Sequence, residues 1–371
     1  MIGFCAVPDL RVLIAGGGTG GHIIPGLAIA DELRLHHGAE IAWVGTERGL
    51  ETRLVPAAGY PLHLVEVGQL KGVSLRTRLA TLTAVPHALM ECKALLRQFR
   101  PQVVIGVGGY ASGPAMMAAV LDRTPTLAFE PNAAPGLTNR LIGRWVSGAA
   151  VNFPAAGRFF RRAEVTGIPV RPEFFALPQK DPASAPHILV FGGSQGARAL
   201  NTRMPEIARQ LLEAVPGLAL LHQAGARHAD ATRQAYEASG AAADRWQVQA
   251  FLDDMPARFA AADLVLARSG ASTVAELCAA GKPSLLVPFP AAADDHQRKN
   301  AEVLAKAGAA LLLPEAEMSA ERLLIELVHA FSDRVHMAEM GNRTRALAHP
   351  DATARIAAIA VRLTQRKTAG R

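Results

Sequence analysis

The sequence has 371 residues, a net charge of +7 and a hydrophobic fraction of 50%. This length exceeds that of an ordinary single domain, so we expect two domains, each with its own core. No apolar run approaches the roughly 18 residues that span a bilayer, and no secretion signal is recognisable, so we expect neither a membrane-spanning nor a secreted protein. Three widely separated cysteines suit a reducing compartment and give no metal-binding spacing.

The positive charge is concentrated between Val67 and Arg162, where 12 Lys and Arg stand against three acidic residues. Such a segment favours phosphate groups in a nucleotide, a nucleic acid or an anionic membrane. Aromatic residues make up only 5% of the chain and are not interleaved with the basic ones. Nucleic-acid binding is therefore disfavoured, because aromatic stacking platforms are missing.

Short β-type runs alternate with helical stretches, which predicts doubly wound parallel sheets covered by helices on both faces. In the first half we expect strands at residues 12–15, 41–45, 103–106, 126–129 and 149–152. A proline-rich break follows, and the second half then has expected strands at 187–191, 219–222, 264–267, 284–287 and 310–312. We expect an N-terminal domain over 1–168, a linker over 169–186 and a C-terminal domain over 187–350.

Each half opens with a glycine-rich turn after its first strand, AGGGTGGH at residues 15–22 and GGSQGA at residues 192–197. A turn between a strand and a helix presents free N–H groups and the positive helix end to an anion. Two such domains facing each other would place a phosphate-binding turn on either side of a cleft.

The first turn leaves several interpretations open. It matches the dinucleotide fingerprint G-x-G-x-x-G, but the acidic residue expected at the end of the second strand is absent, with only Glu47 or Arg48 just beyond. A nicotinamide-dependent enzyme is therefore one hypothesis. The turn is a poor P-loop, because His22 stands where Lys is needed. His22 is either an exposed residue at a helix start or a proton acceptor beside an anion-binding turn.

A second cluster lies in ARSGASTVAELCAAG at residues 267–281, which predicts a helix from about Ser272 to Ala280. Arg268 and the free helix N–H groups could cradle a diphosphate, and Glu276 could accept two hydrogen bonds from a ribose diol. Thr273 and Glu276 also have capping-box spacing, which needs no ligand. Both interpretations stay open.

A third stretch, PFPAAADDHQ at residues 288–297, follows the next expected strand at the edge where ligands bind in such sheets. Adjacent side chains diverge, so Asp294, Asp295 and His296 do not make a convincing metal site. A loop that hydrogen-bonds sugar hydroxyls through Gln297 is the more economical interpretation.

Taken together, these motifs resemble those of the bacterial MurG-type glycosyltransferases over residues 16 to about 351. The motifs are GGTGGHxxPG at 17–26, GGYxSGP at 108–114, EPNxxPGLTN at 130–139, GGSQGA at 192–197, RSGAxTxxE at 268–276 and DHQ at 295–297. The resemblance implies the GT-B fold, with two Rossmann-like domains facing across a cleft. The first domain would face the acceptor and the membrane, the second would bind the donor, and a last helix at about 351–371 would pack back on the first.

The resemblance also implies an activity. The family transfers N-acetylglucosamine from UDP-N-acetylglucosamine to the 4-hydroxyl of the undecaprenyl-diphosphate-linked muramoyl pentapeptide, lipid I, and forms lipid II for peptidoglycan. The displacement would be inverting and would need no metal or other cofactor, because Arg268 and helix N-termini can stabilise the departing diphosphate. A UDP-sugar 2-epimerase of the same fold and a non-catalytic UDP-binding module are the alternatives.

A lipid-linked acceptor implies a peripheral protein at the cytoplasmic face of the inner membrane, on an anionic surface. Leu75, Leu79, Leu82 and Leu89 recur at helical spacing, with basic residues at 71, 76, 78, 93, 97 and 100. This pattern fits a core-facing helix with a solvated basic face or, given a lipid acceptor, a membrane-binding helix.

By the same resemblance, His22 is the preferred general base and Glu130 the second choice. Ser194 and Arg268 would contact the diphosphate, the Leu252 backbone the uracil, Glu276 the ribose and Gln297 the sugar hydroxyls. The remaining implied contacts are Thr19, Gly20, Gly21 and Asn132 in the first domain, Arg171 in the linker, Ala271, Ser272, Thr273, Val274 and Ala275 on the donor helix, and Tyr110 on the acceptor side.

Overall fold

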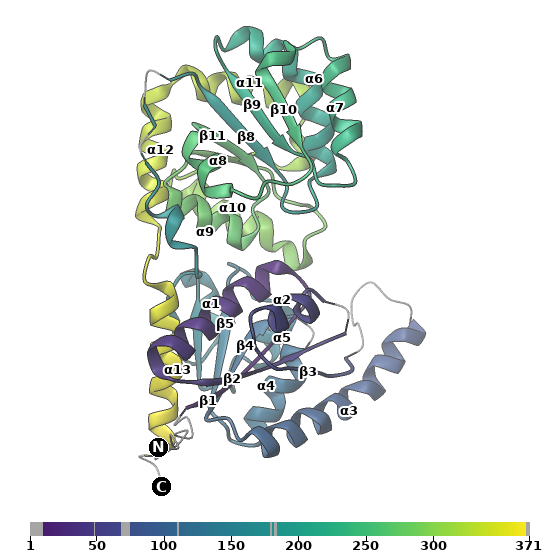
Figure 1. Ribbon diagram of the computed structural model, residues 1–371, viewed down its shortest axis with the longest axis vertical. Coiled ribbons are helices and arrows are strands. Elements are labelled where there is room, and N and C mark those ends of the chain that lie inside the picture. The colour runs from purple at the N-terminus through teal and green to yellow at the C-terminus, as the bar shows by residue number, and fades with distance from the viewer. Residues whose placement is uncertain are drawn as a thin grey trace, which may run out of the picture. The chain divides into compact units, whose positions relative to one another are not determined.

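The computed structural model describes residues 10–47, 49–67, 75–109, 111–178, 180–181 and 184–368, and their side chains except at 75–85 and 366–368. The chain divides into two compact units, Met1–Pro169 together with Asp351–Arg371, and Val170–Pro350. The expected linker residues from 170 onward thus belong to the second unit. Figure 1 shows the course of the chain through both units, from purple to yellow.

The first unit is built on a parallel seven-stranded sheet with the order β3-β2-β1-β4-β5-β6-β7. Its inner strands are continuous apolar runs because helices cover both of its faces. The strands are β1 (Arg11–Gly16), β2 (Glu40–Gly45), β3 (Leu62–Leu64), β4 (Val103–Gly108), β5 (Thr126–Glu130), β6 (Gly148–Val151) and β7 (Ala163–Val165).

The helices of the first unit connect these strands, and the last one returns from the C-terminal end of the chain. They are α1 (Gly20–His37), α2 (Glu51–Ala57), α3 (Leu75–Phe99), α4 (Ser112–Leu121), α5 (Leu137–Ile142) and α13 (Ala352–Thr368), with a 3-10 helix at Pro154–Phe159. Figure 1 shows α13 in yellow beside α1 in purple, and the two helices are in contact. Ile359 and Leu363 of α13 lie against Gly148 at the start of β6.

The glycine turn of the first unit is held close to the sheet by a buried tryptophan. Trp43 is fully buried on β2, and its indole N–H donates to the Gly16 carbonyl oxygen at 2.8 Å. A Cβ on Gly26 would lie 2.6 Å from the Trp43 ring, so only glycine lets α1 pack this closely. The start of α1 is thereby fixed relative to β1.

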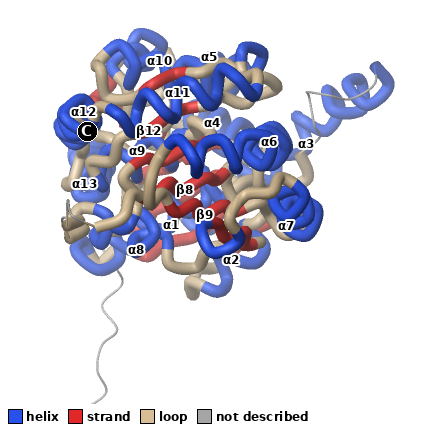
Figure 2. The backbone as a smooth tube through the Cα atoms, turned by 90° about the horizontal axis from the view of Figure 1, so that it is seen from above, coloured by secondary structure: helices blue, strands red, loops and turns tan. Residues whose placement is uncertain are grey.

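The second unit has a parallel six-stranded sheet with the order β10-β9-β8-β11-β12-β13. In Figure 2, helices lie on both sides of β8 and β9. The strands are β8 (His187–Phe191), β9 (Ala219–Gln223), β10 (Trp246–Gln249), β11 (Leu264–Ala267), β12 (Ser284–Leu286) and β13 (Leu311–Leu312). The α-helices are α6 (Arg198–Ala214), α7 (Ala229–Ala238), α8 (Met255–Ala261), α9 (Ala271–Ala280), α10 (His296–Lys306), α11 (Ala320–Ser332) and α12 (Arg334–Ala346). Short 3-10 helices cover Pro172–Phe174, Ala243–Arg245, Ala293–Asp295 and Glu315–Glu317.

The strands expected from apolar runs are confirmed, with shifts of a residue or two at their ends. The sequence interpretation missed β3, β7 and β10, which all lie at sheet edges. Edge strands are buried on fewer sides and so carry a weaker hydrophobic pattern. Cys92 and Cys278 are buried free thiols, as expected, whereas Cys5 lies outside the described residues.

Candidate functional site

Two backbone N–H groups of the first unit's glycine turn donate hydrogen bonds within the protein. The Gly17 N–H donates to the Gly108 carbonyl at 3.2 Å, and the Gly18 N–H donates to the Glu51 carboxylate at 2.8 Å. Helix α1 begins immediately afterwards, with Thr19 as its N-cap. The N–H groups of the first turn of a helix precede any intrahelical acceptor, so Gly20 and Gly21 present donors at the tip of the turn.

Glu51 is the residue that shapes this turn, and the sequence interpretation missed it. Its side chain is fully buried at the start of α2. Besides the Gly18 N–H, it accepts the Thr46 N–H at 3.0 Å and the Thr46 hydroxyl at 2.9 Å. The carboxylate therefore ties the turn after β1 to the turn after β2. The signal for Glu51 in the sequence was an acidic residue just after the glycine-containing turn at residues 45–49, which follows β2.

Three glycines surround the Glu51 side chain. A Cβ on Gly17, Gly45 or Gly49 would lie 2.1, 2.6 or 1.8 Å from its nearest atom, respectively. Each of these contacts is too short for a real Cβ, so the glycines are required by the buried carboxylate. Glu47, the acidic residue considered for a dinucleotide ribose, lies in an exposed turn, and Arg48 lies outside the described residues.

His22 is the third residue of α1 and is half-buried, not exposed. A Cβ on Gly108 would lie 2.6 Å from the His22 Nδ1 atom, so the imidazole packs on the bare backbone of that glycine. Gly108 and Gly109 both have positive φ, at 101° and 82°, which glycine adopts readily. The two glycines after β4 thus seat the histidine ring beside the first glycine turn.

Glu130 ends β5 and is 2% exposed. Its two oxygens accept hydrogen bonds from the Asn132 backbone at 3.0 Å and amide at 3.3 Å, the Gly136 backbone at 3.1 Å and the Asn139 amide at 2.9 Å. Burial raises the pKa of Glu130, and these donors oppose the rise. The carboxylate thus organises the loop over 131–136 and holds Asn132 beside it.

The glycine turn of the second unit packs on the end of β9. A Cβ on Gly196 would lie 1.8 Å from the Ala224 carbonyl oxygen, and one on Gly225 would lie 2.2 Å from the Gln195 carbonyl oxygen. Gly193, Gly196 and Gly225 all have positive φ. This close backbone contact leaves Ser194 exposed at the tip of the turn, ahead of the N-terminus of α6.

Gln223, a second residue that the sequence interpretation missed, joins this turn to Leu252. The amide of Gln223 donates to the Gly193 carbonyl at 2.9 Å and accepts the Leu252 N–H at 3.3 Å. Gln223 and Leu252 are each 3% exposed. The Leu252 N–H is therefore engaged, and its carbonyl oxygen is the backbone group left for recognition.

Arg268 follows β11 and is 8% exposed. Its guanidinium donates to the Val287 and Pro288 carbonyls at 3.0 and 3.1 Å and forms an ion pair with Glu315 at 2.5 Å. It also lies 5.4 Å from the centre of the Phe289 ring. Through these contacts Arg268 holds the segment after β12 in place, and Glu315 partly balances its charge.

The capping-box interpretation of Thr273 and Glu276 is wrong. Helix α9 begins at Ala271 with Gly270 as its N-cap, so Thr273 is the third helical residue. Gly281 ends the helix in the left-handed conformation, as expected. Desolvation raises the pKa of Glu276 to about 7, and the nearby Arg171 guanidinium opposes that rise. Glu276 is thus a carboxyl group with no capping role, held close to a positive charge.

Gln297, at the start of α10, holds the segment after β12 in place. Its side-chain oxygen accepts the Phe289 N–H at 3.0 Å, and its carbonyl accepts the buried Ser269 hydroxyl at 2.8 Å. Asp294 and Asp295, just before it, have positive φ of 56° and 55°. Strained backbone at consecutive non-glycine residues is typical of functional loops.

In each unit, the site residues implied by the family resemblance therefore lie at the carboxyl edge of that unit's own sheet, where ligands bind in doubly wound folds. In the first unit these are Thr19, Gly20, Gly21, His22, Glu130 and Asn132, and in the second Ser194, Leu252, Arg268, Ala271, Ser272, Thr273, Val274, Ala275, Glu276 and Gln297, with Arg171 near Glu276. Tyr110 lies outside the described residues. Among the described residues, no three His, Cys, Asp or Glu side chains gather in a metal-binding group.

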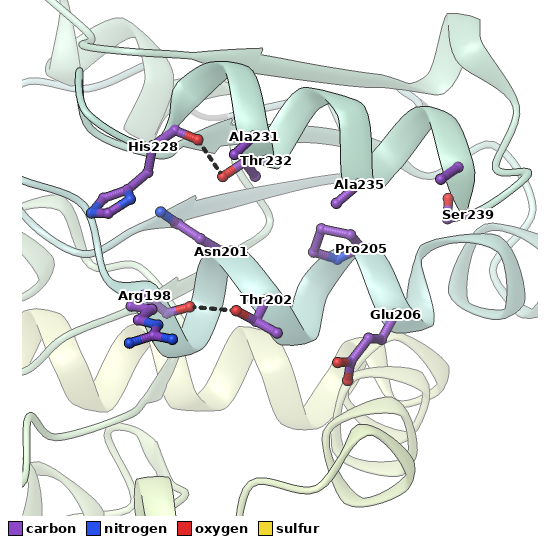
Figure 3. Close-up of a pocket in the computed structure, with 11 residues that line it drawn as sticks. Arg198, Asn201, Thr202, Pro205, Glu206, His228, Ala231, Thr232, Ala235 and Ser239 are labelled. Carbon is purple, nitrogen blue, oxygen red and sulfur yellow. Dashed lines mark hydrogen bonds between the residues drawn. The ribbon is translucent and has the colours of Figure 1, made fainter.

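A groove of about 520 Å³ between α6 and α7 has a different character (Figure 3). Its Thr202 and Thr232 hydroxyls donate back to the carbonyls of Arg198 and His228 on their own helices. Hydroxyl groups satisfied within a helix are poorly placed to select a ligand. The loops at the carboxyl edge, where donors converge, are the better candidates for substrate binding.

Comparison with known proteins places this architecture in a family. Residues 12–151 match the glycosyltransferase family 28 N-terminal domain, and residues 187–356 match the glycosyltransferase family 28 C-terminal domain. A protein from Solibacter usitatus (strain Ellin6076) is 46% identical over 349 residues, which cover 94% of this chain and 94% of that protein. The chain belongs to glycosyltransferase family 28.

The Solibacter relative is named UDP-N-acetylglucosamine--N-acetylmuramyl-(pentapeptide) pyrophosphoryl-undecaprenol N-acetylglucosamine transferase. A relative of the same name from Anaeromyxobacter sp. (strain Fw109-5) is 45% identical over 365 residues, 96% of this chain and 94% of that protein. Among solved structures, MurG of Acinetobacter baumannii superposes with a TM-score of 0.83 at 32% identity, over 95% of this chain and 100% of that one. The two family 28 domains therefore form a GT-B fold, as expected from the sequence.

Proposed function

We propose that this protein transfers N-acetylglucosamine from UDP-N-acetylglucosamine to the 4-hydroxyl of the muramoyl unit of lipid I and so forms lipid II. The observation that carries the proposal is the match, over nearly the full chain at 45% identity, to a transferase named for this reaction. The acceptor oxygen attacks the anomeric carbon, the bond from that carbon to the UDP oxygen breaks, and the configuration at that carbon inverts. The reaction uses no metal.

We assign donor binding to the second unit. Its carboxyl edge combines the exposed Ser194, the N-termini of α6 and α9 and the carboxyl group of Glu276. Helix N-termini attract a diphosphate, and an ionised carboxylate can accept both hydroxyls of a ribose. The Leu252 carbonyl would accept from the uracil, and the Gln297 amide N–H₂ would donate to the sugar, since their other polar groups are engaged.

The departing diphosphate needs positive charge, and we expect the helix N-termini to supply most of it. Arg268 contributes less than a free arginine would, because Glu315 balances its charge at 2.5 Å. Its main role in this proposal is to hold the segment after β12, and with it Gln297, in the right place. Arg171, which is exposed and close to Glu276, adds a further positive charge.

We assign the general base to His22. Its imidazole lies in the first turn of α1, beside the first-turn donors, and imidazole is the side chain that most often acts as a general base. Glu130 is the weaker candidate, because four donors already occupy its two buried oxygens. Glu130 would instead position Asn132, which by the family resemblance approaches the donor's sugar and diphosphate.

We also propose that the protein works at the cytoplasmic face of the inner membrane, where its acceptor is anchored. No helix in the described part of the chain has the length and apolarity to cross a bilayer. On α3, Met90 is 61% exposed, close to Lys93 and Arg97. The side chains of Leu75, Leu79 and Leu82 lie outside the described residues, so they remain part of the expectation. Equal, weak binding to vesicles with and without anionic lipid would contradict the membrane proposal.

One incubation tests the reaction itself. Radiolabelled UDP-N-acetylglucosamine is supplied with and without a short-chain lipid I analogue, and the products are separated. We expect label in the lipid fraction only when the acceptor is present, together with stoichiometric UDP. Conversion of the free sugar nucleotide to its 2-epimer would instead identify an epimerase, and UDP binding without turnover would identify a binding module.

A further inference from the structure

The first unit has a polar cavity at the opposite edge of its sheet from the glycine turn. It has a volume of about 490 Å³ and lies at the amino ends of β5, β6 and β7, whereas the glycine turn follows the carboxyl end of β1. The residues that line it are Val120, Arg123, Thr124, Pro125, Thr126, Arg144, Trp145, Val146, Ser147, Arg161, Arg162 and Leu363. We call it the arginine pocket.

The charge of the arginine pocket is one-sided. Four of its lining residues are arginines, all exposed, and none is acidic. Within the part of the chain that the structure describes, these four guanidinium groups form no ion pair and no side-chain hydrogen bond. The acidic residues that neighbour them in the sequence have other partners, since Asp122 accepts the Thr124 hydroxyl at 2.8 Å and Glu164 pairs with Arg362.

Other surface arginines of this protein behave differently. Many of them pair with an acidic residue three or four positions away on the same helix, as Arg34, Arg203, Arg233, Arg298, Arg322 and Arg343 do. Four like charges around one cavity repel each other, so an anion is the missing complement. The arginine pocket is therefore an unusual feature of this surface.

The backbone conformation of Arg123 is a second unusual feature of the arginine pocket. This residue follows the C-cap of α4 and has a φ of 58°, in the left-handed region where helices usually end on glycine. The Thr124 N–H closes the helix end by donating to the Ala119 carbonyl at 2.9 Å. Glycine would fit this conformation without strain, so an arginine at this position carries a backbone cost.

Helix ends explain only part of this cluster. Arg123 and Arg144 come just after α4 and α5, where a positive charge complements the helix dipole. Arg161 and Arg162 instead precede β7, after an extended Phe160 with a φ of −116°. Helix dipoles therefore do not account for all four arginines of the cavity.

The floor and rim also suit a phosphate-bearing ligand. Thr126 and Ser147 form the polar floor, where the Thr126 N–H donates to the Ser147 hydroxyl and the Ser147 N–H donates to the Thr126 hydroxyl, at 3.2 and 3.0 Å. Trp145 stands at the rim and is 64% exposed. An exposed indole among arginines can cover the organic part of a ligand whose phosphate the guanidinium groups bind.

We propose that the arginine pocket binds a phosphate group of at least two negative charges, carried by a soluble molecule or by an anionic lipid headgroup. The site is separate from the glycosyl-transfer site and does not depend on the proposed reaction. Leu363 of α13 lines it, so the ligand also contacts the last helix of the chain.

The test uses the full-length protein with saturating UDP, which blocks diphosphate binding at the donor site. Sodium pyrophosphate is titrated by calorimetry, and Trp145 fluorescence is followed in parallel. We expect Arg161→Gln/Arg162→Gln to weaken binding at least tenfold. Arg209→Gln, a matched change at an exposed position on α6, should alter it less than twofold. Trp145→Phe should remove the fluorescence signal while the calorimetric signal remains.

Arg123→Gly gives a signature that a merely structural arginine would not. We expect it to weaken pyrophosphate binding several-fold while raising the melting temperature, because the charge is lost and the backbone strain is relieved. Unchanged binding by Arg123→Gly, or parent-like binding by the double variant, would overturn the proposal.

A parallel experiment with lipid vesicles identifies whether the phosphate belongs to a lipid or to a soluble molecule. Vesicles of phosphatidylcholine with 30% phosphatidic acid, whose phosphomonoester headgroup can carry two negative charges, are compared with pure phosphatidylcholine vesicles. A blue shift of Trp145 only with the anionic vesicles, lost in the double variant, supports a lipid headgroup. A response to pyrophosphate alone supports a soluble ligand, and a response to neither probe refutes the site.

Discussion

Replacing Glu51 by glutamine tests whether a buried carboxylate sets the geometry of the first glycine turn. Glu51 accepts three hydrogen bonds, at 2.8, 3.0 and 2.9 Å, from Gly18 and Thr46. The amide of glutamine has the same shape but only one acceptor atom. Whichever way it turns, the N–H of Gly18 or Thr46 then faces an N–H₂ group and loses its acceptor.

The expected destabilisation follows from these three bonds. A buried donor left without an acceptor costs about 1–3 kcal/mol, and each bond that changes from a charged to a neutral acceptor loses about 1 kcal/mol. With one orphaned N–H and two weakened bonds, Glu51→Gln should lower the free energy of unfolding of the first unit by about 3–5 kcal/mol. The donors of Gly20 and Gly21 would shift as the turn relaxes, so kcat should fall about 10- to 100-fold.

Urea unfolding followed through Trp43 measures the stability change. Trp43 is fully buried and hydrogen-bonded to Gly16, so its emission reports on this turn. Replacing Trp145 and Trp246 by phenylalanine leaves it as the single tryptophan of the chain. Glu40→Gln, at an exposed position on β2, is the matched control and should change stability by less than about 0.5 kcal/mol. A Glu51→Gln protein as stable as this control would refute the reasoning.

Four further predictions concern single side chains. His22→Ala should lower kcat about 10²- to 10⁴-fold at saturating substrates, and near-normal turnover would remove His22 from the base role. Glu130→Gln should also lower turnover, but its thermal stability should fall as well, because all four donors lose a charged acceptor and two of them then face an N–H₂ group. Binding of UDP-N-acetylglucosamine should weaken about tenfold per pH unit below about 7, because Glu276 then protonates. Glu276→Gln should flatten that profile, and a flat parent profile would contradict the ribose assignment. Burial lowers the pKa of His222 to about 3, so only the unfolded chain takes up this proton below pH 6.5. Stability should therefore fall by about 2 kcal/mol between pH 7 and pH 5, relative to His222→Gln. Parallel pH profiles of the two proteins would contradict this.

Much of the fold could be predicted because the inner strands are buried on both faces. Runs such as Val12 to Ala15 have no polar positions and so stand out in the sequence. The short edge strand β3 is only partly buried, and its pattern is too weak to recognise. The glycine turns were visible from composition alone.

The candidate site was predicted less completely, because the supporting contacts join residues far apart in the sequence. Glu51 matters through its closeness to Gly17 and Thr46, and Gln223 through Gly193 and Leu252. No local pattern encodes such pairs. The capping-box interpretation failed for a local reason, since it depended on where α9 begins.

The configuration of the new glycosidic bond tests the central claim most directly. The donor carries its sugar in the α configuration, so a single inverting displacement must give a β linkage. We predict that proton NMR of the product formed from UDP-N-acetylglucosamine and a short-chain lipid I analogue shows a large anomeric coupling, typical of a β-(1→4) linkage to the muramoyl unit. A small α-type coupling, or no disaccharide at all, would contradict the account.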